Sequence, residues 1–379
     1  MSDTGALRPI SGPTAAGQAG PVARSLAVRR RVRAAVSWLH LWTGLTAGVL
    51  FALIGLSGSV LVFHQDLLHA RHPQLWNSTP TSEGVVLEGI LERWTPRGLS
   101  AIDLPRDSLP VYQAYFEDET RRYFDPRSGE LLLSRHADDD ALLWLHELHT
   151  ALLGGESGHE LVGVIGWIAL GMLLTGLYLW WPALGRILAQ FRVYSGPPVR
   201  RWLTWHRSIG VISLPLLLLV TATGVAMIYH AGARTVLTTM FGGDDGPSTP
   251  RAITSKSGSP DWRQVLAGAR AALPHSELTR LSAPEPGSNV IGFRARARGE
   301  WHPNGRSLVF TDRTGRNVLL THDATTQPLG ARMTEAIYPL HIGAVGGLAY
   351  RWLVALSGLL PAFMLVSGFL FWRRRRGKR

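Results

Sequence analysis

The chain has 379 residues, with 39 lysines and arginines, 27 aspartates and glutamates, and no cysteine. The lack of cysteine excludes disulfides, thiolate metal sites, iron–sulfur clusters and thiol nucleophiles, so a redox group would need other ligands. The formal charge of +12 sits mainly beside the ends of long apolar runs, where topology and anionic lipid headgroups account for it, and it does not indicate nucleic-acid binding.

Four long apolar runs predict a membrane α-helical protein in contact with the lipid bilayer. They cover 34–63, 161–181, 209–229 and 346–372, and each has the ~20 residues that a helix needs to cross the hydrocarbon core. Pro215 and Pro361 lie inside the third and fourth runs, where a proline removes a backbone donor and bends a helix.

The arginines predict the orientation of these helices. They gather before the first run, between the second and third, and after the fourth. Positive charge is retained on the cytoplasmic side of short loops. We therefore expect a multi-pass protein of the bacterial inner membrane, with both termini cytoplasmic and two large domains in the periplasm.

The expected segments follow from these boundaries. The first segment is rich in Ser, Gly, Pro and Ala and has no apolar core of the kind that a cleavable signal needs. In chain order we expect a disordered cytoplasmic tail (1–28), transmembrane helix 1 (29–64), a periplasmic domain (65–145), a periplasmic helix with transmembrane helix 2 (146–182), a cytoplasmic connection (183–204), transmembrane helix 3 (205–230), a second periplasmic domain (231–337), transmembrane helix 4 (338–372) and a basic cytoplasmic tail (373–379).

Each polar segment predicts a small α+β module. In the first, 83–94 has a helical pattern, 111–116 and 121–124 favour strands, and a turn at 125–129 leads to a further apolar stretch at 130–133. The second segment follows the same plan, with a helix at 262–272, strands at 290–296 and 307–311, and a turn at 312–315. We expect one helix and an antiparallel sheet in each.

Histidines and glycines recur at fixed offsets between the two halves. At an offset of 166 (206 − 40), His40, Gly44, Gly58 and His64 recur as His206, Gly210, Gly224 and His230. At an offset of 192 (341 − 149), His149, Gly154, Gly155, Gly176 and Trp180 recur as His341, Gly346, Gly347, Gly368 and Trp372. One histidine at a membrane edge more often binds only a carbonyl or water, but six matched histidines indicate a group that both halves bind.

Two motifs carry a family resemblance. They are Trp-Leu-His-Leu-Trp-Thr-Gly at 38–44 and Gly-Phe-Leu-Phe-Trp-Arg-Arg at 368–374, within a doubled order of helix, small domain with an Asp-to-Gly hairpin, and helix. Over residues 30–376 the chain resembles the PepSY-associated transmembrane helix family, whose members include inner-membrane ferric-siderophore reductases and other iron-regulated proteins. The resemblance implies four transmembrane helices in two pseudo-twofold repeats, each with a PepSY-like periplasmic domain inserted between its helices.

The histidines are candidate ligands of b-type haem, which needs one or two neutral imidazoles and an apolar slot. His40 and His64 are 24 residues apart, or ~36 Å along a helix, which one macrocycle cannot bridge. We therefore expect two haems. The cytoplasmic pair is His40 and His206; the periplasmic group is His64, His149, His230 and His341, with its pairing open. Gly44 and Gly210, one turn after the first pair, would leave room for a porphyrin.

Other polar residues have weaker claims. His146 lies one turn before His149, but its counterpart at the second offset is Tyr338, so we place it outside the ligand set. The remaining histidines have no matched partner and are expected to be exposed or to contact substrate. Candidates for contacting anionic groups are Arg121, Arg122, Arg294, Arg296 and Arg298, although arginines in such strands more often lie on solvated faces.

These features and the resemblance predict a haem-dependent oxidoreductase resembling the ferric-siderophore reductases. It would take electrons from an unidentified donor and reduce an Fe(III) chelate in the periplasm, which weakens binding by hard oxygen donors and releases Fe(II) for uptake. The alternative is a non-enzymatic, membrane-anchored PepSY binding or regulatory protein with structural histidines. A transporter is disfavoured because the helices carry no buried acidic residue to couple an ion.

Overall fold

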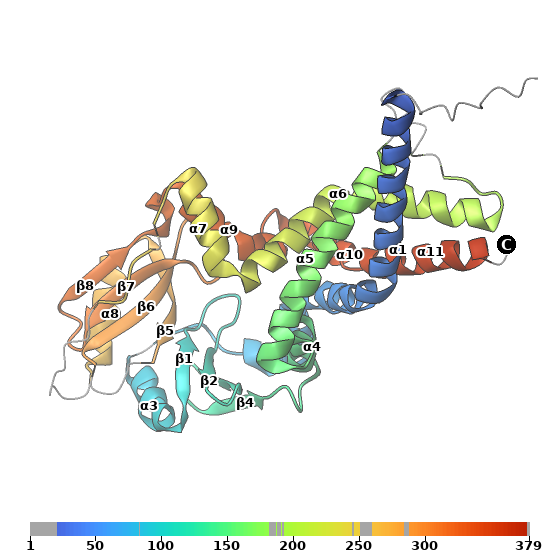
Figure 1. Cartoon of the computed structure of the whole chain (residues 1–379). Coiled ribbons are helices and arrows are strands. Elements are labelled where there is room, and N and C mark those ends of the chain that lie inside the picture. The colour runs from blue at the N-terminus through green and yellow to red at the C-terminus, as the bar shows by residue number, and fades with distance from the viewer. Residues whose placement is uncertain are drawn as a thin grey trace, which may run out of the picture.

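The computed structural model describes residues 21–82, 84–181, 187, 191, 193–244, 246–250, 260–283 and 288–376. Four of its helices are long and apolar enough to cross a membrane: Ser25–Leu61, Gly155–Trp180, Pro198–Ile228 and Gly347–Arg376 (Figure 1). The chain is thus a multi-pass membrane protein with a separate antiparallel sheet domain, as the apolar runs predict.

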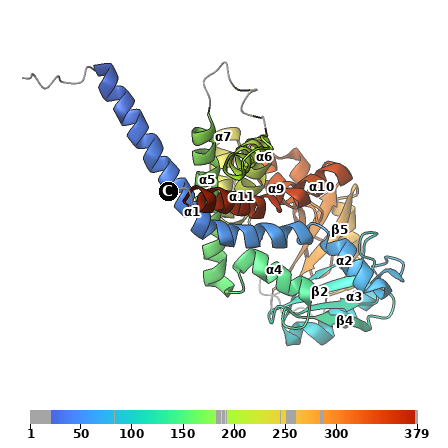
Figure 2. The same cartoon turned by 90° about the vertical axis from the view of Figure 1, so that its right-hand side faces the viewer.

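The spanning helices form a closed ring. Their bounds are α1 (Pro21–Leu61), α5 (Gly155–Trp180), α6 (Pro198–Ile228), α10 (Gly347–Ser357) and α11 (Leu360–Arg376). Helix α1 contacts α5 and α11, and α6 contacts the same two helices from the other side. In both views the N-terminal end of α1 and the C-terminal end of α11 lie away from the sheet domain (Figures 1 and 2).

Two of the predicted boundaries in this region are wrong. Helix α1 begins at Pro21, so residues 21–28 are helical where we expected a disordered tail. The fourth apolar run is two helices, separated at Gly358 and Leu359, because Pro361 cannot donate a backbone hydrogen bond. A Cβ on Gly55 of α1 would lie 2.6 Å from the carbonyl oxygen of Gly358, so the break is packed tightly against α1.

Parts of six predicted segments lie outside the described residues. These are 1–20 of the first tail, 83 of the first periplasmic domain, 182 at the end of transmembrane helix 2, 183–186, 188–190 and 192 of the connection, 245, 251–259 and 284–287 of the second periplasmic domain, and 377–379 of the basic end. The described part of the connection already contains the first turns of α6, which begins at Pro198 rather than near residue 205.

Shorter helices flank the sheet. They are α2 (His64–Arg71), α3 (Gly84–Trp94), α4 (Ala141–Ala151), α7 (His230–Phe241), α8 (Trp262–Ala272) and α9 (Leu329–His341), with 3₁₀ turns at Pro73–Trp76, Thr95–Arg97 and Ala324–Thr326. The predicted helices 83–94 and 262–272 are found as α3 and α8. Helix α9 and the turn after it separate the second polar segment from α10, so residues 338–346 are not part of the spanning helix.

All strands belong to one sheet of order β4-β3-β2-β1-β5-β6-β7-β8. The strands are β1 (Leu99–Asp103), β2 (Tyr112–Phe116), β3 (Arg121–Phe124), β4 (Leu131–Arg135), β5 (Ser276–Ser282), β6 (Val290–Ala297), β7 (Ser307–Asp312) and β8 (Val318–His322). The two expected modules are therefore not separate. The antiparallel pairing of β1 with β5 joins them and satisfies backbone groups that two separate sheets would expose at their edges.

The core of this domain lies between the sheet and the pair α3 and α8. Leu87, Leu266, Ile102 and Phe293 are buried there, one from each helix and one from each half of the sheet. The two predicted hairpin turns end in Gly129 and Gly315, with φ of 70° and 68°, a left-handed conformation that favours glycine. One face of the sheet is thus covered by α3 and α8. The opposite face, which we call the open face, is not in contact with these two helices, but at its β3 end Tyr123 packs under Leu68 of α2 and Leu75 of the first 3₁₀ turn.

Candidate functional site

Two histidines face each other within the ring of spanning helices. His40 of α1 and His206 of α6 have ring centroids 6.4 Å apart and nearly perpendicular planes, at 88°. Both line a cavity of about 660 Å³ between α1, α5, α6 and α11. Gly44 and Gly210 also line this cavity. We call His40 and His206 the distal pair, because they lie far from the sheet.

Hydroxyl groups fix the ring orientation of the distal pair. Nδ1 of His40 lies 3.0 Å from Oγ1 of Thr175, which itself donates to the carbonyl oxygen of Met172. Because that hydroxyl proton is used, Oγ1 accepts from Nδ1–H. Nδ1 of His206 lies 3.0 Å from Oγ of Ser367, whose hydroxyl likewise donates to a carbonyl of its own helix. In both rings Nε2 is left without a proton and can bind a metal.

The end of the cavity away from the sheet is basic. Arg30, Arg33, Arg207 and Arg375 are among its lining residues. Trp180 also lines it, and its buried Nε1–H has no hydrogen-bond partner in the described part of the chain. Guanidinium and indole N–H groups at one end of an apolar slot are suited to bind the carboxylates of an otherwise apolar ligand.

A second histidine pair lies where the spanning helices meet the sheet domain. His149 of α4 and His341 of α9 have ring centroids 6.2 Å apart and an interplanar angle of 42°. Nδ1 of His149 lies 2.8 Å from the carbonyl oxygen of Ile54, and Nδ1 of His341 lies 3.0 Å from that of Val220. A carbonyl oxygen can only accept, so Nδ1 carries the proton and Nε2 is again free. We call His149 and His341 the proximal pair.

Matched glycines make room for the proximal pair. A Cβ on Gly58 would lie 2.7 Å from Cε1 of His149, and one on Gly224 would lie 3.0 Å from Cε1 of His341. Both distances are too short for ordinary contact. These two glycines therefore serve the histidine rings rather than an approach between spanning helices.

The polar contacts recur at the same two offsets as the histidines. Ile54 and Val220 differ by 166 (220 − 54), and Thr175 and Ser367 by 192 (367 − 175). Oγ of Ser57 and Oγ1 of Thr223, again 166 apart, lie 3.3 and 3.2 Å from Nδ1 of the proximal histidines. Sequence reasoning missed these partners because each hydroxyl pair exchanges serine for threonine; a search for matched hydroxyls would have found them.

The other two candidate ligands lie outside both pairs. His64 and His230 are the first residues of α2 and α7, and both are exposed. Among the described residues no ring contact joins them. His302, expected to be exposed or to contact substrate, is buried and stacks on Tyr338 at 4.9 Å between ring centroids.

The spacing within each pair fits a metal held between two imidazoles. Nε2 binds metals at about 2.0 Å and lies about 1.1 Å from the ring centroid, so two imidazoles on opposite sides of one metal would have centroids about 6.2 Å apart. The observed distances are 6.4 and 6.2 Å. In the described residues no group of three or more His, Asp or Glu side chains could hold a metal ion. Each pair would therefore supply two imidazoles to a metal whose remaining ligands belong to a bound cofactor.

The two pairs lie closer together than expected. The proximal pair sits at the level of Gly58 on α1, 18 residues after His40, which corresponds to about 27 Å along the helix. If His64 had belonged to the second pair, the two pairs would have been separated by ~36 Å along the helix. Helix α4 packs against α1, and His149 contacts α1 at Ile54 and beside Gly58, before the level of His64 is reached.

The family model described as PepSY-associated TM region matches residues 37–375. The chain belongs to this family. The match runs from Ser37 in α1 to Arg375 in the last turn of α11, so the spanning helices and the sheet domain of this PepSY-associated protein form one family unit. A comparison with curated proteins found no match.

The candidate arginines separate between the two faces of the sheet. Arg122 lies over the rings of Trp94 and Phe116 on the covered face. Arg121 lies over Tyr115 on the open face. Arg294 is partly buried, while Arg296 and Arg298 are exposed.

Proposed function

We propose that this protein binds two b-type haems and passes electrons through the bacterial inner membrane to an Fe(III) chelate in the periplasm. The observation that carries the proposal is the arrangement of the four paired histidines. In these four rings every Nδ1 donates to a carbonyl or hydroxyl, every Nε2 is free, and both pairs have the centroid spacing that two imidazoles on one metal would have. Placing a histidine among membrane-spanning helices costs free energy, so four paired histidines indicate a binding role rather than packing alone.

Different residues of the chain would bind the iron and the propionates of each haem. His40 and His206 would bind one iron, and His149 and His341 the other. The apolar walls of the distal cavity would exclude water, and Arg33, Arg207, Arg375 and Trp180 would bind the propionates. A bound haem iron alternates between Fe(III) and Fe(II) and so accepts and donates single electrons.

The direction of transfer follows from the expected topology. The N-terminal end of α1 and the C-terminal end of α11 lie away from the sheet domain (Figure 2). With the arginine-rich ends in the cytoplasm, the distal pair would lie near the cytoplasmic surface and the proximal pair near the periplasm. An acceptor bound to the sheet domain would then be next to the proximal pair.

The acceptor is inferred from the family resemblance. Fe(III) is bound tightly by hard oxygen donors, and Fe(II) less tightly, so reduction releases the metal for import. The chelate is the substrate in this scheme, and the protein needs only to deliver one electron to it.

Absorption spectra of the purified protein test the proposal. We expect a Soret band and, after reduction with dithionite, the sharp bands of a low-spin b-type haem. Under anaerobic conditions an Fe(III) chelate should reoxidise the reduced protein while a chromogenic Fe(II) chelator detects the product. Absence of a Soret band after expression with ample haem would instead favour the non-enzymatic PepSY regulatory protein. Reduced haem that no Fe(III) chelate oxidises would exclude iron as the acceptor.

A further inference from the structure

Arginines line up across the open face of the sheet. Arg121 is paired in register with Tyr115, and Arg280 is paired both with Asp103 and with Arg294. Directly paired residues of antiparallel strands project from the same face. The row therefore crosses the junction of the two halves, opposite α3 and α8.

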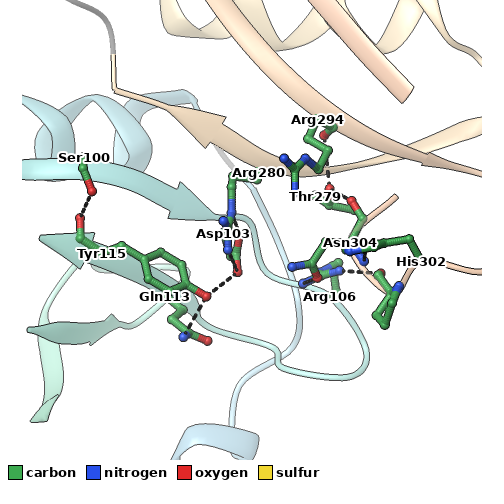
Figure 3. Close-up of polar contacts among 11 residues, drawn as sticks. Ser100, Asp103, Arg106, Gln113, Tyr115, Thr279, Arg280, Arg294, His302 and Asn304 are labelled. Atoms are coloured by element: carbon green, nitrogen blue, oxygen red, sulfur yellow. Dashed lines mark hydrogen bonds and ion pairs between the residues drawn. The ribbon is translucent and has the colours of Figure 1, made fainter. Parts of the chain in front are cut away.

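Contacts within the row confirm this arrangement. Arg280 forms a two-point ion pair with Asp103, at 2.5 and 3.0 Å, and the Tyr115 hydroxyl donates to the same carboxylate at 3.0 Å (Figure 3). The guanidinium groups of Arg121 and Arg280 lie 5.8 and 4.5 Å from the centre of the Tyr115 ring. Figure 3 shows Arg294 on the neighbouring strand, beside Thr279.

Positive charge exceeds negative charge on this face. Asp103 is taken by Arg280, and Glu335 of α9 is shared between Arg306 and Arg234. Among the described residues neither Arg121 nor Arg294 has a carboxylate within ion-pair distance. A partly buried guanidinium without a counter-ion is costly. We call the set Arg121, Arg280, Arg294 and Arg306 the basic face.

The titration of a nearby histidine reports the same positive potential. His302 is buried beside this face, and its Nδ1 accepts from the backbone N–H of Asn304 at 3.1 Å. Burial, together with the charges of Arg306 and Arg294, lowers its pKa to about 3. The positive charges that disfavour protonation of His302 would favour an anion bound beside it.

The basic face is next to the proximal pair. His146 and Tyr338 occupy matched positions, 192 apart (338 − 146), one helical turn before His149 and His341. Burial and then the charge of Arg121 lower the pKa of His146 to about 4, and Arg121 also acts on Tyr338. The charge of Arg121 thus acts on the residues that lie one helical turn before each proximal histidine.

We propose that the basic face is the docking site of the iron chelate and that it selects chelates with a net negative charge, such as tris-catecholate complexes, over neutral tris-hydroxamate complexes. The inference rests on the proposed function for the identity of the ligand. Anionic oxygens would give Arg121 and Arg294 the charged hydrogen-bond partners that the protein does not supply. A neutral complex would bury the same guanidinium groups without this compensation.

Binding of redox-inert gallium complexes tests the proposal on the full-length protein in detergent. Titration calorimetry with Ga(III) tris-catecholate and with a neutral Ga(III) tris-hydroxamate should give at least about tenfold tighter binding of the anionic complex. Raising the ionic strength should weaken the binding of the anionic complex but not that of the neutral one. Equal affinity for the two complexes, or no binding of either, would overturn the inference.

Neighbouring residues of β3 provide a matched pair of variants. Arg121→Gln and Arg294→Gln should each weaken binding of the anionic complex by about tenfold. Arg122→Gln removes the same charge from the covered face and should leave binding unchanged. If Arg121→Gln and Arg122→Gln behave alike, net charge rather than this site attracts the anion. Arg294→Lys retains the charge and should bind the anionic complex more tightly than Arg294→Gln does. This result would show that the loss in Arg294→Gln does not come from misfolding.

Haem content separates this inference from two other outcomes. The arginines could instead bind the propionates of a haem at the proximal pair. In that case Arg121→Gln and Arg294→Gln would lower the haem content, and docking of a chelate would be refuted. Binding of gallium complexes does not require haem. A protein that lacks haem but binds the anionic complex would thus refute the proposed electron transfer and retain the docking site.

Discussion

The carbonyl oxygen of Ile54 accepts a hydrogen bond from Nδ1 of His149, at 2.8 Å, and so connects a spanning helix to a helix of the extramembrane domain. His341 makes the equivalent contact with Val220 at 3.0 Å. The proximal pair is thus positioned by the spanning helices although neither histidine belongs to one. This arrangement fixes which ring nitrogen of each histidine carries the proton and leaves Nε2 available to bind a metal.

Gly58→Ala should displace the ring of His149. The added Cβ would lie 2.7 Å from Cε1, and the ring cannot move without losing its bond to Ile54. We expect a loss of about 1–3 kcal/mol in stability from overpacking, and lower haem content at the proximal pair alone. Thermal unfolding and the haem-to-protein ratio measure the two effects. Gly171→Ala, where nothing lies within 4 Å of the new Cβ, is the control and should change neither.

Asp140→Asn should loosen the helix that carries His149. Asp140 caps α4 by accepting from the backbone N–H of Leu142 and Leu143, and it pairs with the buried Arg135 at 2.7 Å. Loss of the carboxylate leaves Arg135 buried without its partner, which costs about 3–5 kcal/mol. Hydrogen exchange should show faster opening of α4. The exposed neighbour Asp139 gives the control variant Asp139→Asn, and equal effects of the two substitutions would refute the role of the cap.

The same carboxylate predicts an acid limit of stability. These contacts hold the pKa of Asp140 at about 2, below its ordinary value of 3.8. The stabilisation of the fold by this carboxylate is therefore complete above pH ~4 and is lost as the pH falls toward 2. As the pH falls, Asp140 is protonated in the unfolded chain before it is protonated in the folded protein. Denaturant unfolding from pH 5 to 2 should show a steeper loss in wild type than in Asp140→Asn. Parallel curves would contradict this pH dependence.

His302 predicts a second effect at higher pH. Its pKa of about 3 lies below the ordinary 6.5, so the unfolded chain gains a proton that the folded chain does not. Stability should fall as the pH drops from ~6.5 toward 3, by at most about 1.4 kcal/mol per pH unit from this group. His302→Gln should reduce that slope between pH 6 and 4. A variant with the slope of wild type would show that His302 is protonated in the folded protein.

The sequence predicts the elements whose signals are local. Apolar runs predict the spanning helices, and the periodicity of 262–272 predicts α8 with its observed bounds. Strands β1 and β5 were missed because each is stabilised by a partner from the other half of the chain. Their polar residues Asp103 and Arg280 pair only across that junction and obscure the alternation of a strand.

The pairing of the candidate histidines could be predicted only in part, for a similar reason. His40 and His206 lie in long helices whose register can be counted. The position of His149 depends on a reversal after α4, where Leu152 and Leu153 have φ of 48° and 61°, a conformation unusual for leucine. Periodicity cannot predict such a turn, so His149 could not be distinguished from His64 by sequence alone.

The number of haems bound per chain tests the assignment of the two histidine pairs. We expect two haems per wild-type chain, one in His40→Ala with His206→Ala, and one in His149→Ala with His341→Ala. All four substitutions together should leave none, while His64→Ala with His230→Ala should retain two. A pyridine haemochrome assay on each purified protein gives these ratios. Two haems retained without His149 and His341, or a haem lost with His64 and His230, would contradict the pairing described here.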